Sequence, residues 1–463
     1  MLRRNALALM FVATLGTASA QDGNPADIDF LFRPTQGLDG DAFEEDIWDW
    51  EQEPEVSLLE SEIGPPLLGP EEIEEDAVER RTRREDADPF APIGVNVGPF
   101  VIRPAIEIGI AATDNVSGGT DKEAAVGLVL APDISMRSED ERHEFEALVR
   151  GEAIFYEEEE FDELSGEARA RLRYDLAART SLYSEAYYTQ FLEDFTDPDT
   201  PDAAAERPAV RAFGGSLGVE KRFGRIAALG SAFVERSLHE DVPLAGGGTA
   251  SREELDDTEY GVRLRTTYGT DRSLAPFTEV ALGRRDMDQE VDDSGFERSA
   301  LWGELRGGLV IDRGAKLSGE ISAGYRHEDL EDGRLEDMDV FLANAAILWS
   351  PRRLTEVRFD LGTDTMTTSV PDVSGSVLYG GTLTVTQRLT SRISAEGGAG
   401  LSYERPIGDD WDEWTIAGFA GATYSFNRTA ALHARYVYER SESSESGEDT
   451  DEHEVSLRIR LQR

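Results

Sequence analysis

The hydrophobic pattern of the chain repeats every second residue from about residue 92 to the C-terminus. In the last segment, the odd positions from 455 to 461 are Val, Leu, Ile and Leu, whereas the even positions from 456 to 462 are Ser, Arg, Arg and Gln. Successive side chains of a β-strand point to opposite faces, so this pattern predicts strands with one apolar and one polar face. The same pattern recurs at 168–176, 260–266, 316–321 and 357–361.

The connections between these predicted strands alternate in length and composition. Short turn sequences, each with an arginine, occur at 178–181, 223–225, 270–273, 312–314, 350–353, 390–392 and 426–429. Longer acidic sequences occur at 157–163, 193–208, 239–257, 286–297, 329–337, 406–413 and 441–454. Short periplasmic turns and long outer loops are typical of transmembrane barrels, and the pattern accommodates about eighteen strands. An even number of strands places both ends of the barrel on the periplasmic side.

A soluble β-sandwich would also alternate, and three features favour the membrane. The segments exceed the roughly 9–11 residues with which a tilted strand crosses a bilayer. A strand and its connection together take about twenty residues, whereas the repeat of a sandwich is about 8–12. Closure into a barrel also removes the exposed edges of so large a sheet. We therefore predict an all-β fold, a transmembrane antiparallel β-barrel of about eighteen strands with a disordered acidic N-terminal leader.

The N-terminal region differs from the rest of the chain. Residues 1–20 have a positive start, a short apolar run and small residues before Gln21, which predicts a cleaved signal peptide rather than a membrane anchor. Residues 21–91 are rich in Glu, Asp and Pro and predict a mostly disordered periplasmic leader. Its Trp48 and Trp50 are either part of a short docking element for periplasmic partners or scattered residues of a linker. Residues 92–463 form the predicted barrel of the outer membrane.

Composition excludes several classes of function. The chain has 94 Asp and Glu against 46 Lys and Arg, a net charge of −48, so it would repel nucleic acid. It has no cysteine, which removes disulfides and thiolate sites. None of its five histidines lies in a known metal spacing, and no nucleophile, Walker or dinucleotide motif occurs, so we expect neither an enzyme nor a cofactor. The acidic loops either bind Mg²⁺ or Ca²⁺ weakly beside lipopolysaccharide or are simply solvated.

The polar faces of the predicted strands carry many charges. In a barrel of this size the lumen is too wide to be filled by side chains alone, so these charges line a wet interior. The two signs are nearly balanced, which favours a ladder of cross-strand ion pairs over a selectivity filter, although the sequence does not show whether the signs segregate. The bases assigned to the lumen are Arg150, Arg169, Arg171, Arg173, Arg263, Arg265, Arg306, Lys316, Arg326, Arg358, Arg388, Arg435, Arg458 and Arg460. The acids assigned to the lumen are Glu144, Glu146, Glu152, Asp175, Glu304, Glu320, Glu356, Asp360, Glu396, Glu404 and Glu439.

Two segments resemble a known family. The sequence PIGVNVGPFVIRPAIEIG at 92–109, followed by TDNV at 113–116, is similar to the opening of the putative β-barrel porin 2 family. The sequence YVYERS at 436–441 and the closing segment 452–463 are similar to its last hairpin. The resemblance implies an outer-membrane barrel, and some such relatives accompany exopolysaccharide export. One departure concerns the barrel-assembly machinery, which usually reads a terminal aromatic residue, because this chain ends in Arg463.

These observations favour a porin-like channel for passive passage of small polar solutes. Two alternatives remain. One is an outer-membrane conduit for exopolysaccharide export that works with periplasmic partners through residues 21–91. The other is a structural or adhesive surface barrel with a plugged lumen.

Overall fold

A computed structural model describes residues 90–120, 122–138, 143–158, 161–193, 199–201, 203–269, 273–444 and 449–463. The predicted signal peptide, and the predicted leader except Phe90 and Ala91, lie outside these residues. The described part contains a closed barrel of 18 antiparallel strands, as the sequence predicts. Its strands are β2 (Phe100–Thr113), β3 (Ala125–Ser138), β4 (His143–Phe155), β5 (Glu163–Ala177), β6 (Thr180–Leu192), β7 (Ala209–Phe223), β8 (Ile226–His239), β11 (Asp257–Tyr268), β12 (Leu274–Met287), β13 (Ala300–Asp312), β14 (Leu317–Leu330), β15 (Met338–Arg352), β16 (Thr355–Met366), β17 (Gly375–Arg388), β18 (Ile393–Ile407), β19 (Glu413–Asn427), β20 (Ala430–Ser443) and β21 (Thr450–Gln462).

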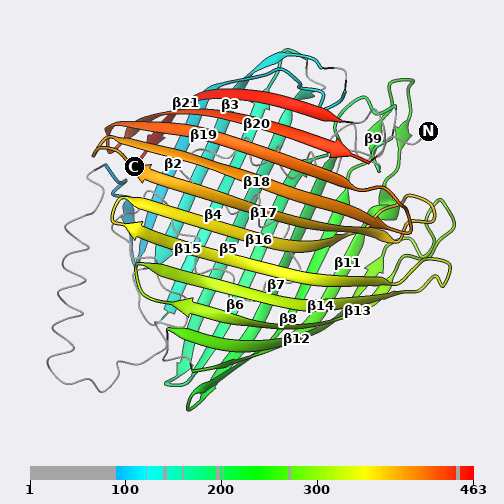
Figure 1. The fold of residues 1–463 in the computed structure, drawn as a ribbon, viewed down its shortest axis with the longest axis horizontal. Helices are drawn as coiled ribbons and strands as arrows, with labels where there is room; N and C mark the ends of the chain where they lie inside the picture. Colours follow the sequence, from blue (N-terminus) through cyan, green and yellow to red (C-terminus); the bar gives the residue numbers. More distant parts are fainter. Residues whose placement is uncertain are drawn as a thin grey trace.

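Each strand pairs with the next along the chain, and the first and last strands close the barrel (Figure 1). The closing ladder between β2 and β21 runs from Ala105 opposite Gln462 to Thr113 opposite Glu454. The short strand β1 (Val95–Val97) pairs with the start of β2. Sequential antiparallel pairing needs no crossover, and closure gives every strand two neighbours, so the barrel has no edge strand.

The connections differ at the two ends of the barrel. The turn between β5 and β6 is residues 178–179, and that between β19 and β20 is residues 428–429. The other end carries the long loops, of which the loop from β8 to β11 contains β9 (Val242–Pro243), β10 (Thr249–Ala250) and a 3-10 helix (Glu253–Leu255). Figure 1 shows the C-terminus at the end with the short turns. Among the described residues, no helix has the length and apolar character needed to cross a bilayer.

The two faces of the wall have opposite chemistry. On the outer face, large apolar side chains are exposed, for example Leu282 at 58% and Leu305 at 60%. Their neighbours along the strands are buried and polar, for example Glu279, Glu304 and Arg306. Exposed aromatic residues lie near strand ends, as an interfacial girdle requires. They include Phe155, Tyr268, Trp349, Trp414, Tyr424 and Phe426.

The wall has one seam, between β15 and β16. The two strands pair from Arg352 opposite Thr355 up to Ala345 opposite Leu361, and the ladder stops there, although both strands continue toward the mouth. Beyond that point the Thr363 hydroxyl accepts a hydrogen bond from the backbone N–H of Ala343 at 3.0 Å. The strands β14–β15 and β16–β17 keep their full ladders, so the break is confined to this seam.

The seam is an overlap of the wall. Met338 and Val340 of β15 share the inner face with Glu328 and Arg326 of β14, their partners in the ladder. They pack in one cluster with Val377 of β17, which alternates with the exposed outer-face residues of that strand. Since an outer face of β17 packs against an inner face of β15, the mouth end of β16 and β17 lies inside the barrel. An apolar cluster thus replaces the missing ladder.

Candidate functional site

The sequence-assigned lumen residues lie in the wall on the face opposite the exposed apolar residues. Most of them are buried, because they pack against one another. Lys316 is different, since it precedes β14 in a turn and is exposed, so it contributes nothing to the inner wall. The residues on this inner face include Arg150, Arg169, Arg171, Arg173, Arg263, Arg265, Arg306, Arg358, Arg435, Arg458, Arg460, Glu146, Glu304, Glu320, Glu356 and Asp360.

The densest part of this wall is an ion-pair network on β11–β14. Glu279 of β12 lies 3.2 Å from Arg263, 3.0 Å from Arg306 and 3.7 Å from Arg265, measured between carboxylate oxygen and guanidinium nitrogen. Arg265 also contacts Glu320 at 2.5 Å. A carboxylate that lies among three guanidinium groups is compensated by their positive charges and loses little by being buried. We call this set the β11–β14 lattice; it also contains Glu259, Arg285, Glu304, Arg326 and Glu328.

A second network follows β4–β6. Glu167 lies 3.3 Å from Arg150 and 3.1 Å from Arg169. Glu185 lies 3.7 Å from both Arg169 and Arg171. The network continues toward the turns, where Arg173 contacts Glu144 and Asp175.

A third network spans the closing strands. Arg460 of β21 contacts Glu107 of β2 at 3.2 Å and Asp133 of β3 at 3.4 Å. Arg458 pairs with Glu152 of β4. These contacts tie the last strand of the barrel to the first three, so the closure is ionic as well as hydrogen-bonded.

The remaining assigned residues are less connected. Arg358 pairs with Asp360 on its own strand at 2.9 Å, and Arg137 pairs with Glu146 at 3.4 Å. The guanidinium carbon of Arg435 lies 4.5 Å from the centre of the Phe419 ring, a cation–π contact. These residues are therefore not gathered into one site.

The inner face of β17–β19 has a different composition, and we call it the hydroxyl face. The structure describes these three strands completely, and by alternation their inward residues include one base, Arg388, at the turn end of β17. The inward hydroxyls include Ser376, Thr382, Thr386, Ser402, Thr415, Thr423 and Ser425, all buried. The inward acids are Glu396, Glu404 and Glu413. The wall is thus not uniform, and one sector carries acids with almost no bases.

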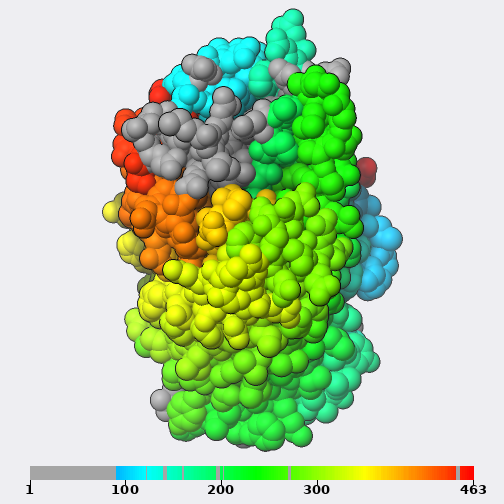
Figure 2. Space-filling view, turned by 90° about the vertical axis from the view of Figure 1, so that its right-hand side faces the viewer, coloured from blue at the N-terminus to red at the C-terminus, as the bar shows by residue number. Residues whose placement is uncertain are grey.

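Three long loops meet over the lumen at the mouth. The loop between β16 and β17 (367–374) reaches the loop between β6 and β7 (193–208), although eight strand positions separate them around the barrel. Asp199 accepts hydrogen bonds from the Ser369 backbone N–H at 2.8 Å, the Ser369 hydroxyl at 2.7 Å and the Thr368 hydroxyl at 3.2 Å. Figure 2 views the end with the long loops. The gold atoms there, in the part of the chain around loop 367–374, lie between green and orange segments.

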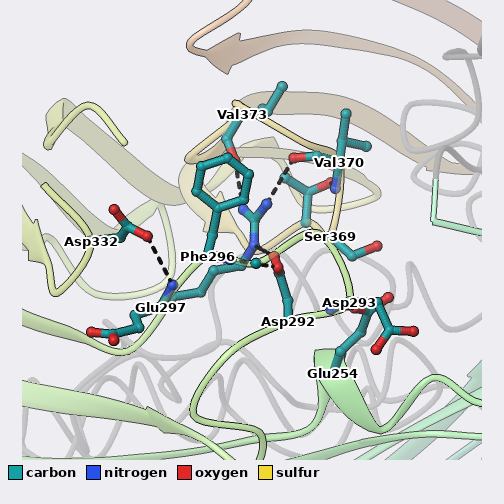
Figure 3. Close-up of polar contacts among 12 residues, drawn as sticks. Glu254, Asp292, Asp293, Phe296, Glu297, Asp332, Ser369, Val370 and Val373 are labelled. Atoms are coloured by element: carbon teal, nitrogen blue, oxygen red, sulfur yellow. Dashed lines mark hydrogen bonds and ion pairs between the residues drawn. The ribbon is translucent and has the colours of Figure 1, made fainter. Parts of the chain in front are cut away.

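Arg298, in the loop between β12 and β13, holds loop 367–374 from another side. Its guanidinium donates to the backbone oxygens of Val373 at 2.6 Å and Val370 at 2.8 Å, and its Nε contacts Asp292 at 2.5 Å. Figure 3 shows dashed lines from the Val370 and Val373 carbonyls to the guanidinium group that lies between them and Asp292. Arg298 is 3% exposed, so its charge is compensated almost entirely by these acceptors.

Sequence reasoning missed several of these residues. Glu279 was not assigned to the lumen, although its alternation with the apolar Val280 and Leu282 would have been a sufficient signal. For Asp199 and Arg298 no local signal exists, because their partners lie in loops far away in the sequence. In the described part of the chain, no group of three or more His, Asp or Glu has metal-binding geometry.

Comparison with solved structures gives remote similarities. A mutant of the ferric enterobactin receptor PfeA from Pseudomonas aeruginosa shares 6% identity and a TM-score of 0.41, with 78% of this chain and 80% of that chain covered. The copper transporter OprC shares 9% identity and a TM-score of 0.40, with 80% and 81% covered. The FrpB iron transporter from Neisseria meningitidis shares 6% identity and a TM-score of 0.41, with 81% and 82% covered. No curated protein matches the sequence.

A family model covers most of the chain. The model described as putative β-barrel porin 2 matches residues 88–463, which includes every strand of the barrel. This result confirms the resemblance carried by the opening segment 92–109 and the closing hairpin. The chain therefore belongs to the putative β-barrel porin 2 family, and it is an outer-membrane β-barrel.

Proposed function

We propose that this barrel is a channel for passive passage of small polar solutes across the outer membrane. The observation that carries the proposal is a closed barrel of 18 strands whose inner wall bears charges of both signs and whose outer wall is apolar. A charged wall is compatible with hydrated solutes, and a barrel with this many strands encloses more space than its own side chains fill.

The mouth limits what passes. The mouth end of β17, which lies inside β15, and the loop 367–374 both narrow the outer end of the lumen. This arrangement supports passage of small solutes and argues against a conduit for polymeric exopolysaccharide. It also makes a plugged structural barrel the second candidate, because three loops bridge the mouth.

Conductance in a planar bilayer separates the two candidates. We expect the wild-type protein to give stable unitary conductance. Arg298→Ala removes the two hydrogen bonds to the carbonyls of loop 367–374. The unitary conductance of this variant should rise at least about twofold, because a pore widens when a constricting loop is released. Arg440→Ala is the matched control, since Arg440 is an exposed arginine paired with Glu442.

Two outcomes would oppose a channel. If the wild-type barrel and the Arg298 variant are both electrically silent while folding normally on gels, the plugged barrel is correct. If exopolysaccharide disappears from the surface of a deletion strain while solute uptake is intact, export is the function.

The surroundings of the barrel are also proposals. We infer that the apolar belt contacts outer-membrane lipid and lipopolysaccharide and that the barrel-assembly machinery inserts it. Residues 21–91 would then extend into the periplasm and offer a tether for partners there.

A further inference from the structure

The seam between β15 and β16 contains strand length that the ladder does not use. The last rung of the ladder joins Ala345 to Leu361, yet β15 begins at Met338 and β16 ends at Met366, both on the mouth side. Antiparallel strands pair rung by rung in a fixed register. The two strands therefore have room for several further rungs without any slip.

Side-chain contacts replace the ladder only in part. The backbone N–H of Ala343 donates to the Thr363 hydroxyl at 3.0 Å, and this hydroxyl donates to the Ala343 carbonyl oxygen at 3.3 Å. The next residue, Asn344, has buried side-chain N and O atoms with no hydrogen-bond partner among the described residues. Buried polar groups are almost always paired, so the overlapped arrangement leaves part of the chain unsatisfied where the ladder stops.

Two glycines face each other directly beyond the last rung. Gly362 of β16 is the ladder partner of Gly380 of β17, and glycine inside a strand weakens it and often marks a bend. From these glycines to the mouth, residues 362–380 form one hairpin with its own complete ladder, which we call the flap. Because β17 also stays paired with β18, the free edge of the flap is that of β16.

Two kinds of contact hold the flap inside β15. Val377, on the outer face of β17, is completely buried in one cluster with Met338 and Val340 of the inner face of β15. At the tip of the flap, Asp199 accepts hydrogen bonds and Arg298 donates them (Figure 3). None of these contacts belongs to a β-ladder, so they can be exchanged for water or lipid while the strands of the flap stay paired.

We propose that the flap is a gate with two positions. In the overlapped position, which the structure shows, it lies inside β15 and narrows the mouth. In the paired position, β16 continues its ladder with β15, Val377 faces lipid and the mouth has the full perimeter of the barrel. Overlap buries apolar side chains and pairing forms backbone hydrogen bonds, so each position has its own stabilisation. This inference rests on the proposed channel and gives it a means of opening and closing.

Disulfide trapping reports the two positions, because the chain has no cysteine of its own. Val340→Cys with Val377→Cys reports the overlapped position, since both residues lie in one cluster. Phe341→Cys with Thr365→Cys reports the paired position, since continued pairing makes them ladder partners, close enough for a disulfide. In the overlapped position β15 separates them, because Phe341 is exposed on its outer face and Thr365 shares the face of Val377.

We expect both reporter disulfides to form when outer membranes that contain the protein are oxidised with copper phenanthroline. The matched control, Phe341→Cys with Val377→Cys, should form none, because two strand spacings, roughly 9–10 Å, separate these positions in the paired wall. Heat-modifiable migration shows that each variant folds, and Met338→Cys replaces Val340→Cys if that variant does not fold. Formation of only one reporter disulfide, or of the control disulfide, would overturn the inference.

The contacts at the tip of the flap have their own test. Arg298→Ala should raise the yield of the disulfide between positions 341 and 365 at least about twofold, because hydrogen bonds of the overlapped position are lost. Arg440→Ala should leave the yield unchanged. An equal yield in both variants would contradict the role given to Arg298.

Conductance separates failure of the gate from failure of the channel. The disulfide between positions 340 and 377 should hold the pore at its lower level, and dithiothreitol should restore transitions to a level at least about twofold higher. If both reporter disulfides form but no variant conducts, the gate is kept and the proposed channel is rejected. If the protein conducts at one level with and without the disulfides, the channel is kept and the gate is rejected.

Discussion

The β11–β14 lattice and the hydroxyl face are built on the same backbone but use charge differently. In the lattice, acids and arginines alternate across four strands, and Glu279 has three basic neighbours. On the hydroxyl face, Glu404 has Glu413 as its neighbour in the ladder. Strand pairing alone therefore does not need a lattice of this density, since the ladders that join β17, β18 and β19 are complete although their inner faces carry one base.

The difference shows which sector of the wall is stabilised by the pairing of its charges. A buried carboxylate that is shared among guanidinium groups is already compensated and has little affinity for an incoming ion. We conclude that the lattice stiffens the wall, whereas the inner face of β17–β19 is lined mainly by hydroxyl groups and acids.

The largest effect should follow from removing the centre of the lattice. Glu279→Ala leaves Arg263 and Arg306 without this carboxylate, and breaking such a buried pair costs up to about 3–5 kcal/mol of unfolding free energy. Urea unfolding in detergent, followed by heat-modifiable migration, measures the loss. Thr382→Ala, a buried inward position on β17, is the control and should cost less than about 1 kcal/mol. Equal losses for the two variants would show that the lattice has no special role.

Replacing a glutamate by glutamine in each sector should change the free energy of unfolding by smaller amounts and in opposite directions. Glu328→Gln weakens contacts with Arg285 and Arg326 and should lower the unfolding free energy by about 1–3 kcal/mol. Glu404→Gln removes a like-charge opposition and should be neutral or stabilising by a few tenths to about 1 kcal/mol in a cation-poor buffer. Destabilisation of both variants to the same extent would mean that Glu404 has a basic partner in solution.

The smallest effect should be a dependence of the lattice-side loops on pH. Arg334 donates hydrogen bonds to Asp332, and they lower the pKa of this carboxyl below its usual 3.8. Asp332 also accepts from the Glu297 backbone N–H at 3.2 Å, as Figure 3 shows. A lowered pKa contributes stability above the usual value, and this contribution is lost as the pH falls through the lowered pKa.

Hydrogen exchange of the loop amides at 288–299 measures this dependence, after correction for the intrinsic rate. Protection should begin to fall as the pH drops below about 4, the usual pKa of an aspartate, and should continue to fall as the pH approaches the lowered pKa of Asp332. Asp332→Asn should have lower protection at neutral pH and a flatter profile. A wild-type profile identical to that of the variant would show that this loop is held by other contacts.

The architecture could be predicted from the sequence because apolar and polar side chains alternate along a barrel strand. Every strand has one face toward lipid, so every strand shows this alternation. The segment 454–462 alternates without interruption and lies in β21 as expected. Ion pairing was predicted as a class, but its partners were not, since Glu279 meets Arg306 only through the register of β12 with β13.

The mouth was the part that sequence reasoning could not reach. The long loops were identified by their acidity, and loop 367–374 carries one acid, Asp372, so this criterion passed over it. Its contacts with Asp199 join residues at least 169 positions apart in the sequence, and its contacts with Arg298 join residues at least 72 positions apart. No local pattern encodes such contacts. The break between β15 and β16 is equally invisible, because both strands alternate normally.

The overlapping seam determines the order in which a solute would meet the narrow rim and the charged wall. At the outer rim β17 lies inside β15, so the barrel is narrower there. Toward the short turns β15 and β16 are paired, and the barrel keeps its full perimeter. In the proposed channel, a molecule arriving from outside would thus be sieved by size before it meets most of the charged wall. Large solutes would be rejected at the rim whatever their charge, and discrimination by sign would act on those already small enough to enter.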